Sequence, residues 1–514
     1  MSLSQKQKNN YYAQVFSALL AVILCIAAVL VYWRAFAADK EDTAYPLEGY
    51  VANYNPYIQQ FDALKKGQTN IDWEADPALE ELENVYDYSE RTASKIYYLW
   101  DRAYYDGKYY SYFGLAPVLT VYFPYYWING TLPGTGYVMT IFCLIAAIFM
   151  PLCLFQWAWN FAPKTPHWLL LTGSCALFWG SLILLLARGY TPFYYIACVA
   201  GLAFLSAFFW LCLRAYSEKE LWLRCVLYAL AGIAFGLTFQ SRINIAFAAA
   251  FAVLPGLWFF IIRRRRNEKG LSSLWRILAE LASLGLPVLL FFAGSMIFNA
   301  MRFSGPLDFG TDYQLTVCDT STYKVRLRDI PFAYFHYLLD MPADTDVYPY
   351  ITLSYIKFSN YGHYVYKDAS LGMFAVPLAV GVICSPAIIF SKNFTPRARV
   401  FSACALMCVL TVPVLDFGLG GVIYRYTGDF TFIGVFLAGT SLISLCGRIG
   451  EKKGKKYTAL MYIAYAFCAV FFVFSVIACI RLVLINDNGN VNRYGEELSE
   501  AVEKLLPFKA AAAD

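Results

Sequence analysis

Four ionisable residues lie inside or at the ends of long apolar runs: Arg188, Arg242, Arg425 and Asp429. If such runs cross a membrane, burying each charge costs several kcal/mol unless the charge is paired or hydrated. A functional role is therefore the first hypothesis. An arginine presents a planar, permanently charged set of donors that suits a phosphate or pyrophosphate. The alternative is pairing with a helix-end carboxylate or a lipid headgroup. Arg425 and Asp429 are four residues apart, so an internal salt bridge between them also fits the sequence.

Carboxylates that could act as a general base are concentrated in the polar segment after the first apolar run. A hydroxyl group that attacks an activated carbon must lose its proton, and Glu41, Asp42, Glu48 and Asp62 are candidates to accept it. Most of the acidic residues between positions 39 and 90 are simply solvated, so none is singled out by position alone. A second polar segment, MRFSGPLDFGTDYQLT, contributes Arg302, Asp308, Asp312, Tyr313 and Gln314, whose spacing specifies no chemistry by itself.

The composition indicates the environment in which these residues act. The chain has 514 residues, of which 59% are hydrophobic and 15% charged, and its mean hydropathy is +0.48. These values exclude disorder, a coiled coil and an ordinary soluble fold, and predict an all-α polytopic membrane protein. The three histidines are far apart and no HExxH or CxxC motif occurs, so a His or Cys metal site has almost no support. Walker and GxGxxG motifs are also absent, which disfavours nucleotide-driven pumping.

The apolar runs predict about eleven transmembrane helices, and the first is too long for a signal peptide. The predicted spans are 12–36, 135–161, 167–187, 192–213, 223–241, 243–262, 278–299, 371–391, 400–420, 429–446 and 457–485. We expect residues 1–486 to form one transmembrane domain and residues 487–514 a tail.

Lysine and arginine residues predict the orientation, because they fall almost entirely in alternate short loops. The loops are marked by Lys6 and Lys8; Arg214, Lys219 and Arg224; Arg263 to Arg266 with Lys269 and Arg276; Lys392, Arg397 and Arg399; and Arg448, Lys452, Lys453, Lys455 and Lys456. The positive-inside rule places these loops and the N-terminus in the cytoplasm and the C-terminal tail outside. A phosphate or nucleic-acid site is the alternative explanation of the basic clusters.

This topology places two long polar loops, 38–134 and 300–370, on the outer side, where we expect function to be located. Within the first loop, residues 113–128 are apolar but short and contain two prolines, which predicts an interfacial helix. Aromatic residues around it predict a belt at headgroup level, which serves either as an anchor or as a guide for a lipid-linked substrate. The belt consists of Trp100, Tyr104, Tyr105, Tyr109, Tyr110, Tyr112, Tyr125, Tyr126 and Trp127.

The motifs together resemble a bacterial family of polytopic glycosyltransferases of the GT-C superfamily. The resemblance is carried by QQFDALKKGQ (59–68), LENVYDYSER (82–91), WDRAYYDGKYYSYFGLAP (100–117), RFSGPLDFGTDYQLT (302–316) and RYTGDF (425–430). It implies interfacial helices and a carboxylate base in the first outer loop, an outward-facing cavity, and a polyprenyl-phosphate sugar as donor. Many GT-C enzymes place an acidic pair soon after the first helix, where this chain has Asn53 and Asn55. Glu48 is therefore ranked first as the base and Asp62 second.

The resulting prediction is an inverting transfer of a sugar to an envelope glycan, lipid or protein at the outer face of a bacterial plasma membrane. We expect Lys108, Arg188, Arg242 and Arg425 to bind the donor phosphate. The expected substrate-binding residues are Asp101, Tyr105, Asp106, Tyr109, Tyr112, Tyr313, Gln314, Tyr426 and Asp429. Membrane lipids are expected partners and nucleic acid is not. No cofactor is expected, with a divalent cation as a weak alternative. A lipid or polysaccharide transporter or flippase, or a non-catalytic assembly subunit, remains the alternative function.

Overall fold

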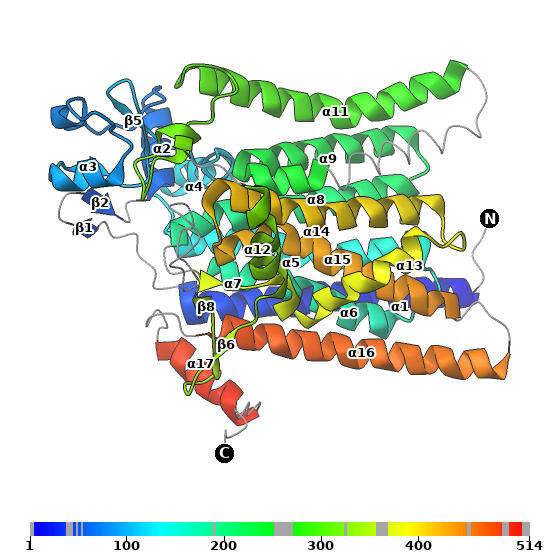
Figure 1. Cartoon of the computed structure of the whole chain (residues 1–514). Coiled ribbons are helices and arrows are strands. Elements are labelled where there is room, and N and C mark those ends of the chain that lie inside the picture. Colours follow the sequence, from blue (N-terminus) through cyan, green and yellow to red (C-terminus); the bar gives the residue numbers. More distant parts are fainter. Residues whose placement is uncertain are drawn as a thin grey trace.

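A computed structural model describes residues 5–37, 45–47, 50–52, 55–188, 192–250, 271–322, 326–355, 369–449, 454–485 and 493–505. Long helices run side by side as a bundle, and the strands and short helices of the first polar loop gather at one of its ends (Figure 1). The long helices are α1 (Gln5–Tyr32), α5 (Thr135–Phe161), α6 (His167–Gly180), α8 (Pro192–Ser217), α9 (Leu221–Ser241), α11 (Leu271–Ala300), α14 (Pro396–Gly420), α15 (Tyr424–Ile449) and α16 (Lys455–Val483).

The described residues contain nine helical segments that are long and apolar enough to cross a membrane. One of them combines α6 with the short α7 (Ile183–Ala187), and another extends α1 into the π segment η1 (Trp33–Ala37). The segments contain 21 to 29 residues, and an apolar core of about 30 Å needs about 20 helical residues. The chain is an all-α polytopic membrane protein.

The helices differ in how much of their surface the protein itself covers. The share of residues that is buried in the most apolar part of each helix is 94% for α8 and 83% for α15, but only 11% for α11. Helices α1 and α16 are also largely uncovered, at 22% and 28%. Helices α8 and α15 therefore form the centre, and α1, α11 and α16 present apolar side chains to acyl chains.

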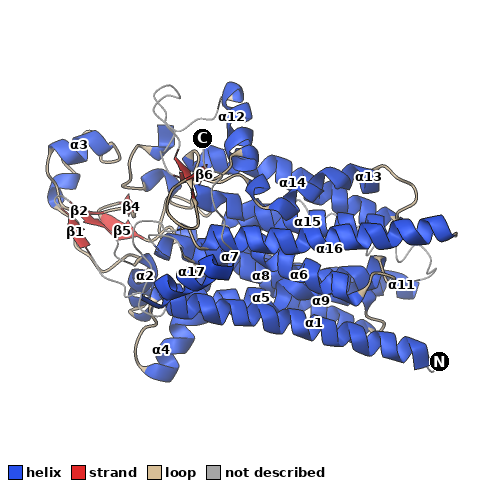
Figure 2. Cartoon of the chain, turned by 90° about the horizontal axis from the view of Figure 1, so that it is seen from below, coloured by secondary structure: helices blue, strands red, loops and turns tan. Residues whose placement is uncertain are grey.

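The two ends of the bundle differ in the segments that they carry. The N-terminus, the turn between α8 and α9 and the first turns of α14 and α16 lie at one end (Figure 1). The strands and the short helices of the first polar loop lie at the other end in both views (Figure 2). This arrangement agrees with the alternation of basic and long polar loops that the sequence predicts.

Two of the predicted spans need separate comment. Over 371–391 the chain forms two 3-10 segments, η9 (Met373–Ala375) and η10 (Pro377–Cys384), followed by α13 (Ser385–Ile389), rather than one long helix. Proline at 377 and 386 removes backbone donors and disfavours helical geometry in the preceding residue, which explains the interruption. Of the predicted span 243–262, residues 243–250 are helical and the rest lies outside the described residues.

The first polar loop contributes to two apolar cores: Tyr57 and Phe61 pack into that of the bundle, while residues 71–109 enclose a smaller one together with Leu315 of the second loop. Its elements are β1 (Tyr45–Leu47), β2 (Tyr50–Ala52), α2 (Pro56–Lys65), η2 (Pro77–Leu79), α3 (Tyr88–Ala93), β3 (Tyr98–Leu99), β4 (Ala103–Tyr105) and β5 (Lys108–Tyr110). Strand β2 pairs with β1 antiparallel and with β3 parallel, while β4 and β5 form a hairpin. Asp106 and Gly107 connect the hairpin with φ angles of 50° and 71°, as a tight two-residue turn requires.

Residues 118–129, near the predicted interfacial helix, form the π segment η3 (Val118–Tyr122) and α4 (Phe123–Asn129). Together they are too short to cross a bilayer. Trp127 and Ile128 are 75% and 81% exposed on this segment. Exposed large apolar groups on a short helix at the end of a bundle fit a position in the membrane interface.

The second polar loop contains short elements, and the last described helix follows α16. These elements are η4 (Thr311–Tyr313), η5 (Thr320–Thr322), η6 (Leu327–Asp329), α12 (Ile330–Tyr334), η7 (Phe335–Leu339), β6 (Ala343–Asp344), β7 (Ile351–Thr352), β8 (Ser354–Tyr355), β9 (Ala369–Ser370) and α17 (Arg493–Leu505). Strand β6 pairs with β7 and β8 with β9, both antiparallel.

Helix α11 lies at the edge of the bundle, along α9 (Figure 1). A buried ion pair joins the two helices, with Arg224 Nε 2.5 Å from Glu280 Oε1. Gly232 and Gly236 on α9 allow the close approach, because a Cβ would lie 2.4 Å from the Leu284 carbonyl oxygen or 2.3 Å from the Phe291 ring. Small residues one helical turn apart commonly mediate close packing between membrane helices.

We expect Gly232→Ala to destabilise the protein by about 1–3 kcal/mol, because the new methyl group would meet backbone that cannot move independently. Gly294→Ala on α11 is the matched control, since nothing lies within 4 Å of the Cβ that it would add. The control should be neutral or stabilising by up to about 1 kcal/mol, because alanine favours the helix. Unfolding with SDS in mixed micelles measures both. Equal stability of the two variants would contradict this account of the packing.

Candidate functional site

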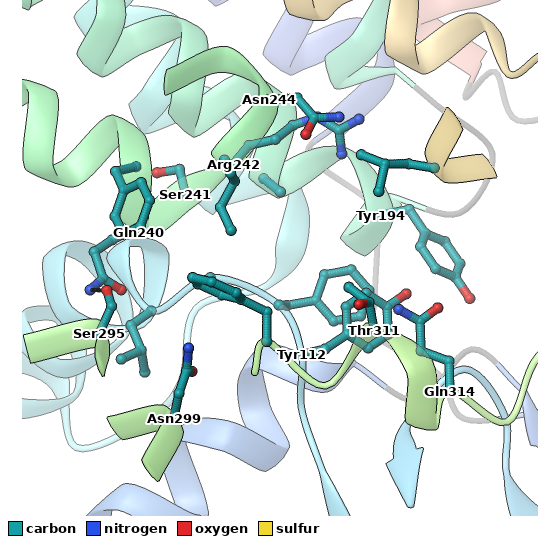
Figure 3. A pocket seen from close by; sticks show the side chains of 18 of the residues that line it. Tyr112, Tyr194, Gln240, Ser241, Arg242, Asn244, Ser295, Asn299, Thr311 and Gln314 are labelled. Carbon is teal, nitrogen blue, oxygen red and sulfur yellow. Dashed lines mark hydrogen bonds between the residues drawn. The ribbon is translucent and has the colours of Figure 1, made fainter. Parts of the chain in front are cut away.

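A cavity of about 420 Å³ lies where the ends of α9 and α11 meet the two polar loops. We call it the Arg425 cavity. Side chains from α8, α14 and α15 complete its wall, and those in Figure 3 include amides, hydroxyls, aromatic rings and a guanidinium. Of the residues that the sequence predicts to bind ligand, Tyr112, Arg242, Gln314, Arg425 and Tyr426 line it.

Arg242 follows the last residue of α9, and its charge is balanced from α15. Its Nε lies 2.6 Å from both carboxylate oxygens of Asp429. Its guanidinium also stacks over the Tyr426 ring, 4.6 Å from the centroid. Beside it, Asn244 Nδ2 donates to Asp416 Oδ1 at 2.5 Å. The internal salt bridge that the sequence also allowed, from Arg425 to Asp429, does not form, because Asp429 pairs with Arg242 instead.

Arg425 differs from Arg242 in having no ion-pair partner among the residues that the structure describes. Its guanidinium lies over two rings, 4.9 Å from the centroid of Tyr194 and 5.3 Å from that of Tyr426. Across the described part of the chain, no hydrogen bond or ion pair is made by this side chain. A cation that lines a cavity between aromatic rings in this way is available to an anionic ligand.

A second arginine, Arg302, faces the cavity from the chain that leaves α11. Its guanidinium donates to the Ser111 carbonyl oxygen at 2.6 Å and to Asn299 Oδ1 at 2.8 Å, while Nε is buried without an acceptor. The guanidinium stacks on Phe298 at 4.1 Å. Burial lowers the pKa of Arg302 to about 10, so the group stays charged at neutral pH.

Asp312 is the carboxylate that lines the cavity, and hydrogen bonds between the two polar loops place it there. Asp101 N donates to the Leu315 carbonyl oxygen and Leu315 N to the Arg102 carbonyl oxygen, each at 2.9 Å. Arg102 is in turn fixed to α2, since its Nε donates to Gln59 Oε1 at 2.7 Å. The exposed Asp312 lies three residues before this connection, in η4.

Asp101 lies behind the cavity wall and holds two of its tyrosines. Its Oδ2 accepts a hydrogen bond from Tyr112 at 3.0 Å, and Tyr194 also bonds to this carboxylate. Burial raises the pKa of Tyr112 well above its usual value, and the charge of Asp101 adds to this effect. The Tyr112 hydroxyl therefore stays protonated as a donor. Gly114 brings this segment against α9, since a Cβ there would lie 1.9 Å from the Gln240 carbonyl oxygen.

Several of the predicted site residues lie elsewhere in the structure. Asp106 and Lys108 are exposed at the hairpin turn, and Tyr109 is buried in the core of the first loop. Tyr105 and Tyr313 pack against each other, with ring centroids 4.7 Å apart and ring planes tilted by 43°.

The predicted phosphate-binding and base residues outside the cavity have different surroundings. Arg188 donates to the Val483 carbonyl oxygen at 2.5 Å and lies over the Phe36 ring. Asp62 is exposed on α2 and does not line the cavity. Glu48 lies outside the described residues.

Other residues at the site were not singled out from the sequence. Gln240, Ser295 and Asn299 lie on one side of the cavity, and Thr311 lies on the opposite side, beside the predicted Gln314 (Figure 3). Asp416 is fully buried in α14. Its position inside the predicted span 400–420 is the same signal that drew attention to Arg425 and could have identified it. Within the described ranges, no three His, Cys, Asp or Glu side chains are arranged to hold a metal ion.

No protein family model matches the sequence, and no curated protein matches it. The chain is similar to the crystal structure of the oligosaccharyltransferase of Archaeoglobus fulgidus in the apo form, with a TM-score of 0.40 and 13% sequence identity. The similarity covers 94% of this chain, which spans 59% of the length of that protein. A TM-score this low does not establish a shared fold.

We expect Arg242→Gln to destabilise the protein by about 3–5 kcal/mol, because the buried Asp429 loses its counter-ion. Asp429→Asn should be destabilising for the converse reason. The double variant should be more stable than the sum of the two effects predicts, because neither charge is then left alone. SDS unfolding of the four proteins gives the coupling energy, and strict additivity would show that the pair does not contribute as described.

Proposed function

We propose that the protein is an integral-membrane glycosyltransferase that takes a sugar from a polyprenyl-phosphate donor in the Arg425 cavity. The observation that carries this proposal is the pair of cations, Arg425 and Arg302, that line one cavity without an ion-pair partner among the described residues. Such groups favour a ligand that brings its own negative charge. The cavity lies at the ends of apolar helices, where a lipid-linked anion would have its headgroup.

The remainder of the cavity suits a sugar. Tyr112, Tyr194 and Tyr426 offer ring faces, and Gln240, Asn299 and Gln314 offer amides that can both donate and accept hydrogen bonds. A volume of about 420 Å³ is within the usual range for small-molecule sites. Cationic and neutral polar groups in the same cavity suit a phosphate joined to a sugar.

In the proposed reaction an acceptor hydroxyl attacks C1 of the sugar and inverts its configuration. The hydroxyl proton passes to a carboxylate, and the bond from C1 to the phosphate oxygen breaks. Arg425 and Arg302 would stabilise the charge that develops on the departing polyprenyl phosphate. Asp312 is the base that we favour, because its exposed carboxylate lines the cavity. Glu48 and Asp62 in the first loop remain the alternatives.

We place this cavity on the outer face of a bacterial plasma membrane, with the N-terminus in the cytoplasm. The support is the gathering of basic loops at the opposite end of the bundle. The acceptor would then be an envelope glycan, lipid or protein. A transporter or flippase for the same lipid would also need a cationic cavity, so catalysis has to be measured directly.

The test is release of polyprenyl phosphate by the purified protein in nanodiscs, with a panel of polyprenyl-phosphate sugars and envelope extracts as acceptors. Asp312→Asn should lower kcat by at least about 10²-fold, with donor affinity largely retained, because the lost group acts on the proton. Arg425→Gln should weaken donor binding and lower kcat together, because the phosphate gains charge as it leaves.

The matched controls are Glu74→Gln and Arg328→Gln, which alter exposed loop charges that do not line the cavity. Both should retain activity. Loss of turnover in Glu48→Gln or Asp62→Asn, with Asp312→Asn active, would transfer the role of base to the first loop. Tight donor binding without release, whatever the acceptor extract, would favour the transporter instead.

A further inference from the structure

Two aspartates from neighbouring helices meet beneath the Arg425 cavity. Asp416 on α14 and Asp429 on α15 are both fully buried. Arg242 contacts Asp429, and Asn244, two residues further on, contacts Asp416, so the two carboxyl groups lie close together and interact. We call them the carboxyl pair. A hydrogen bond between two carboxyl groups requires a proton on one of them, because an ionised carboxylate can only accept.

The remaining partners of the pair show which oxygen needs that proton. Both oxygens of Asp429 accept a hydrogen bond from Arg242 Nε, and Asp416 Oδ1 accepts one from Asn244 Nδ2. Asp416 Oδ2 is buried and has no donor. The Asp429 carboxylate and Asp416 Oδ1 thus each have a protein donor, whereas Asp416 Oδ2 has none among the described residues.

The charges around the pair lead to the same conclusion. Arg242 is the cation in contact with it and can balance one carboxylate. Two ionised carboxylates side by side in a buried site repel each other and lack solvation, so such pairs retain one proton. Burial inside an apolar span increases this penalty.

The other titratable groups that face the pair come from three elements and do not provide a second cation in contact with it. Cys198 of α8 and Tyr337 of η7 are neutral when protonated, and the Tyr337 hydroxyl donates to the Gly421 carbonyl oxygen at 2.7 Å. On α15, Tyr426 is neutral when protonated. Arg425, one turn before Asp429, acts on it through charge alone, because its guanidinium lies over two aromatic rings and forms no ion pair among the described residues.

We propose that the carboxyl pair is a proton-binding site, with the proton on Asp416 Oδ2 directed at Asp429, and that its occupancy sets the affinity of the cavity for anions. The connection is short. Arg242 and Asn244, which contact the pair directly, both line the cavity, as do Gly418 and Leu419 just after Asp416. Loss of the proton adds a negative charge beneath the cavity and weakens anion binding, so protonation and anion binding favour each other. This second part rests on the proposed function.

Asp416→Asn provides the sharpest test, because asparagine reproduces the protonated aspartate. Its carbonyl oxygen can accept from Asn244 and its amide can donate to Asp429. We expect the variant to fold and to be as stable as the original protein at neutral pH. Infrared difference spectra in nanodiscs should show the loss of one carbonyl band of a protonated carboxylic acid, which Glu74→Gln does not remove. An unchanged spectrum would overturn the proposal. Misfolding of Asp416→Asn while the original protein keeps no protonated-carboxyl band at any pH would do so too.

The linkage is tested by equilibrium binding of a short-chain polyprenyl monophosphate to protein in phosphatidylcholine nanodiscs over a range of pH. Because the phosphate itself titrates near pH ~6, the two proteins are compared at each pH. The original protein and Asp416→Asn should bind equally well at low pH. Above the pH at which the infrared band disappears, the original protein should bind more weakly, by up to about tenfold per pH unit for one linked proton.

The outcomes separate the two proposals. If the infrared band depends on Asp416 but both proteins bind the lipid phosphate with equal affinity at every pH, the proton-binding site stands and its coupling to the cavity is overturned. No lipid-phosphate binding by either protein would count against the proposed function and the coupling together, while the infrared band still decides whether the proton is held.

Discussion

A charge within the membrane part of this protein must be stabilised by the protein, because the acyl chains provide no solvation. Most of the arrangement around the cavity follows from this constraint. Arg224 and Arg242 satisfy it with carboxylates at 2.5 Å and 2.6 Å, and each pair connects two helices. Arg425 instead lies over aromatic rings, and Arg302 donates hydrogen bonds to a backbone carbonyl group. The first two arginines join helices, while the second two leave their charge facing an open space.

The wall of the Arg425 cavity is formed by elements that differ in how they are held in the structure. The central helices α8 and α15 are covered on nearly all sides, whereas α11 touches the bundle through α9 and leaves most of its surface to lipid. The polar loops connect the two parts, since backbone bonds join residues 101–102 to Leu315 and an arginine of the same segment binds Gln59 of α2. Asp312 and Gln314 reach the cavity because these bonds hold the second loop against the first.

The membrane class and most of the helices could be predicted from the sequence, because long apolar runs and segregated basic residues are direct consequences of the bilayer. The interrupted segment after residue 371 could not be predicted from hydropathy, which does not register that two prolines remove backbone donors. At the site, the sequence identifies Arg242 and Arg425 by the same rule, namely that an ionisable residue in an apolar span needs a partner or a function. That rule cannot distinguish a paired arginine from an unpaired one. Only the three-dimensional arrangement shows that Asp429 binds the first of them. Asp416 satisfied the same rule and was overlooked.

Arg425 occupies an electrostatically unfavourable position within its helix. Helix α15 begins at Tyr424, so Arg425 lies in the first turn, where the unpaired amide groups and the helix dipole are already positive. A cation there is unfavourable by about 0.3–1 kcal/mol compared with an acidic or neutral residue. Arg242 has no such cost, because Asp429 neutralises it. Arg425 has no ion-pair partner among the residues that the structure describes, so its place at the positive end of a central helix, beside a cavity, costs stability that an incoming anion would restore. Under the proposed function, an anionic ligand explains this placement of Arg425 better than packing does.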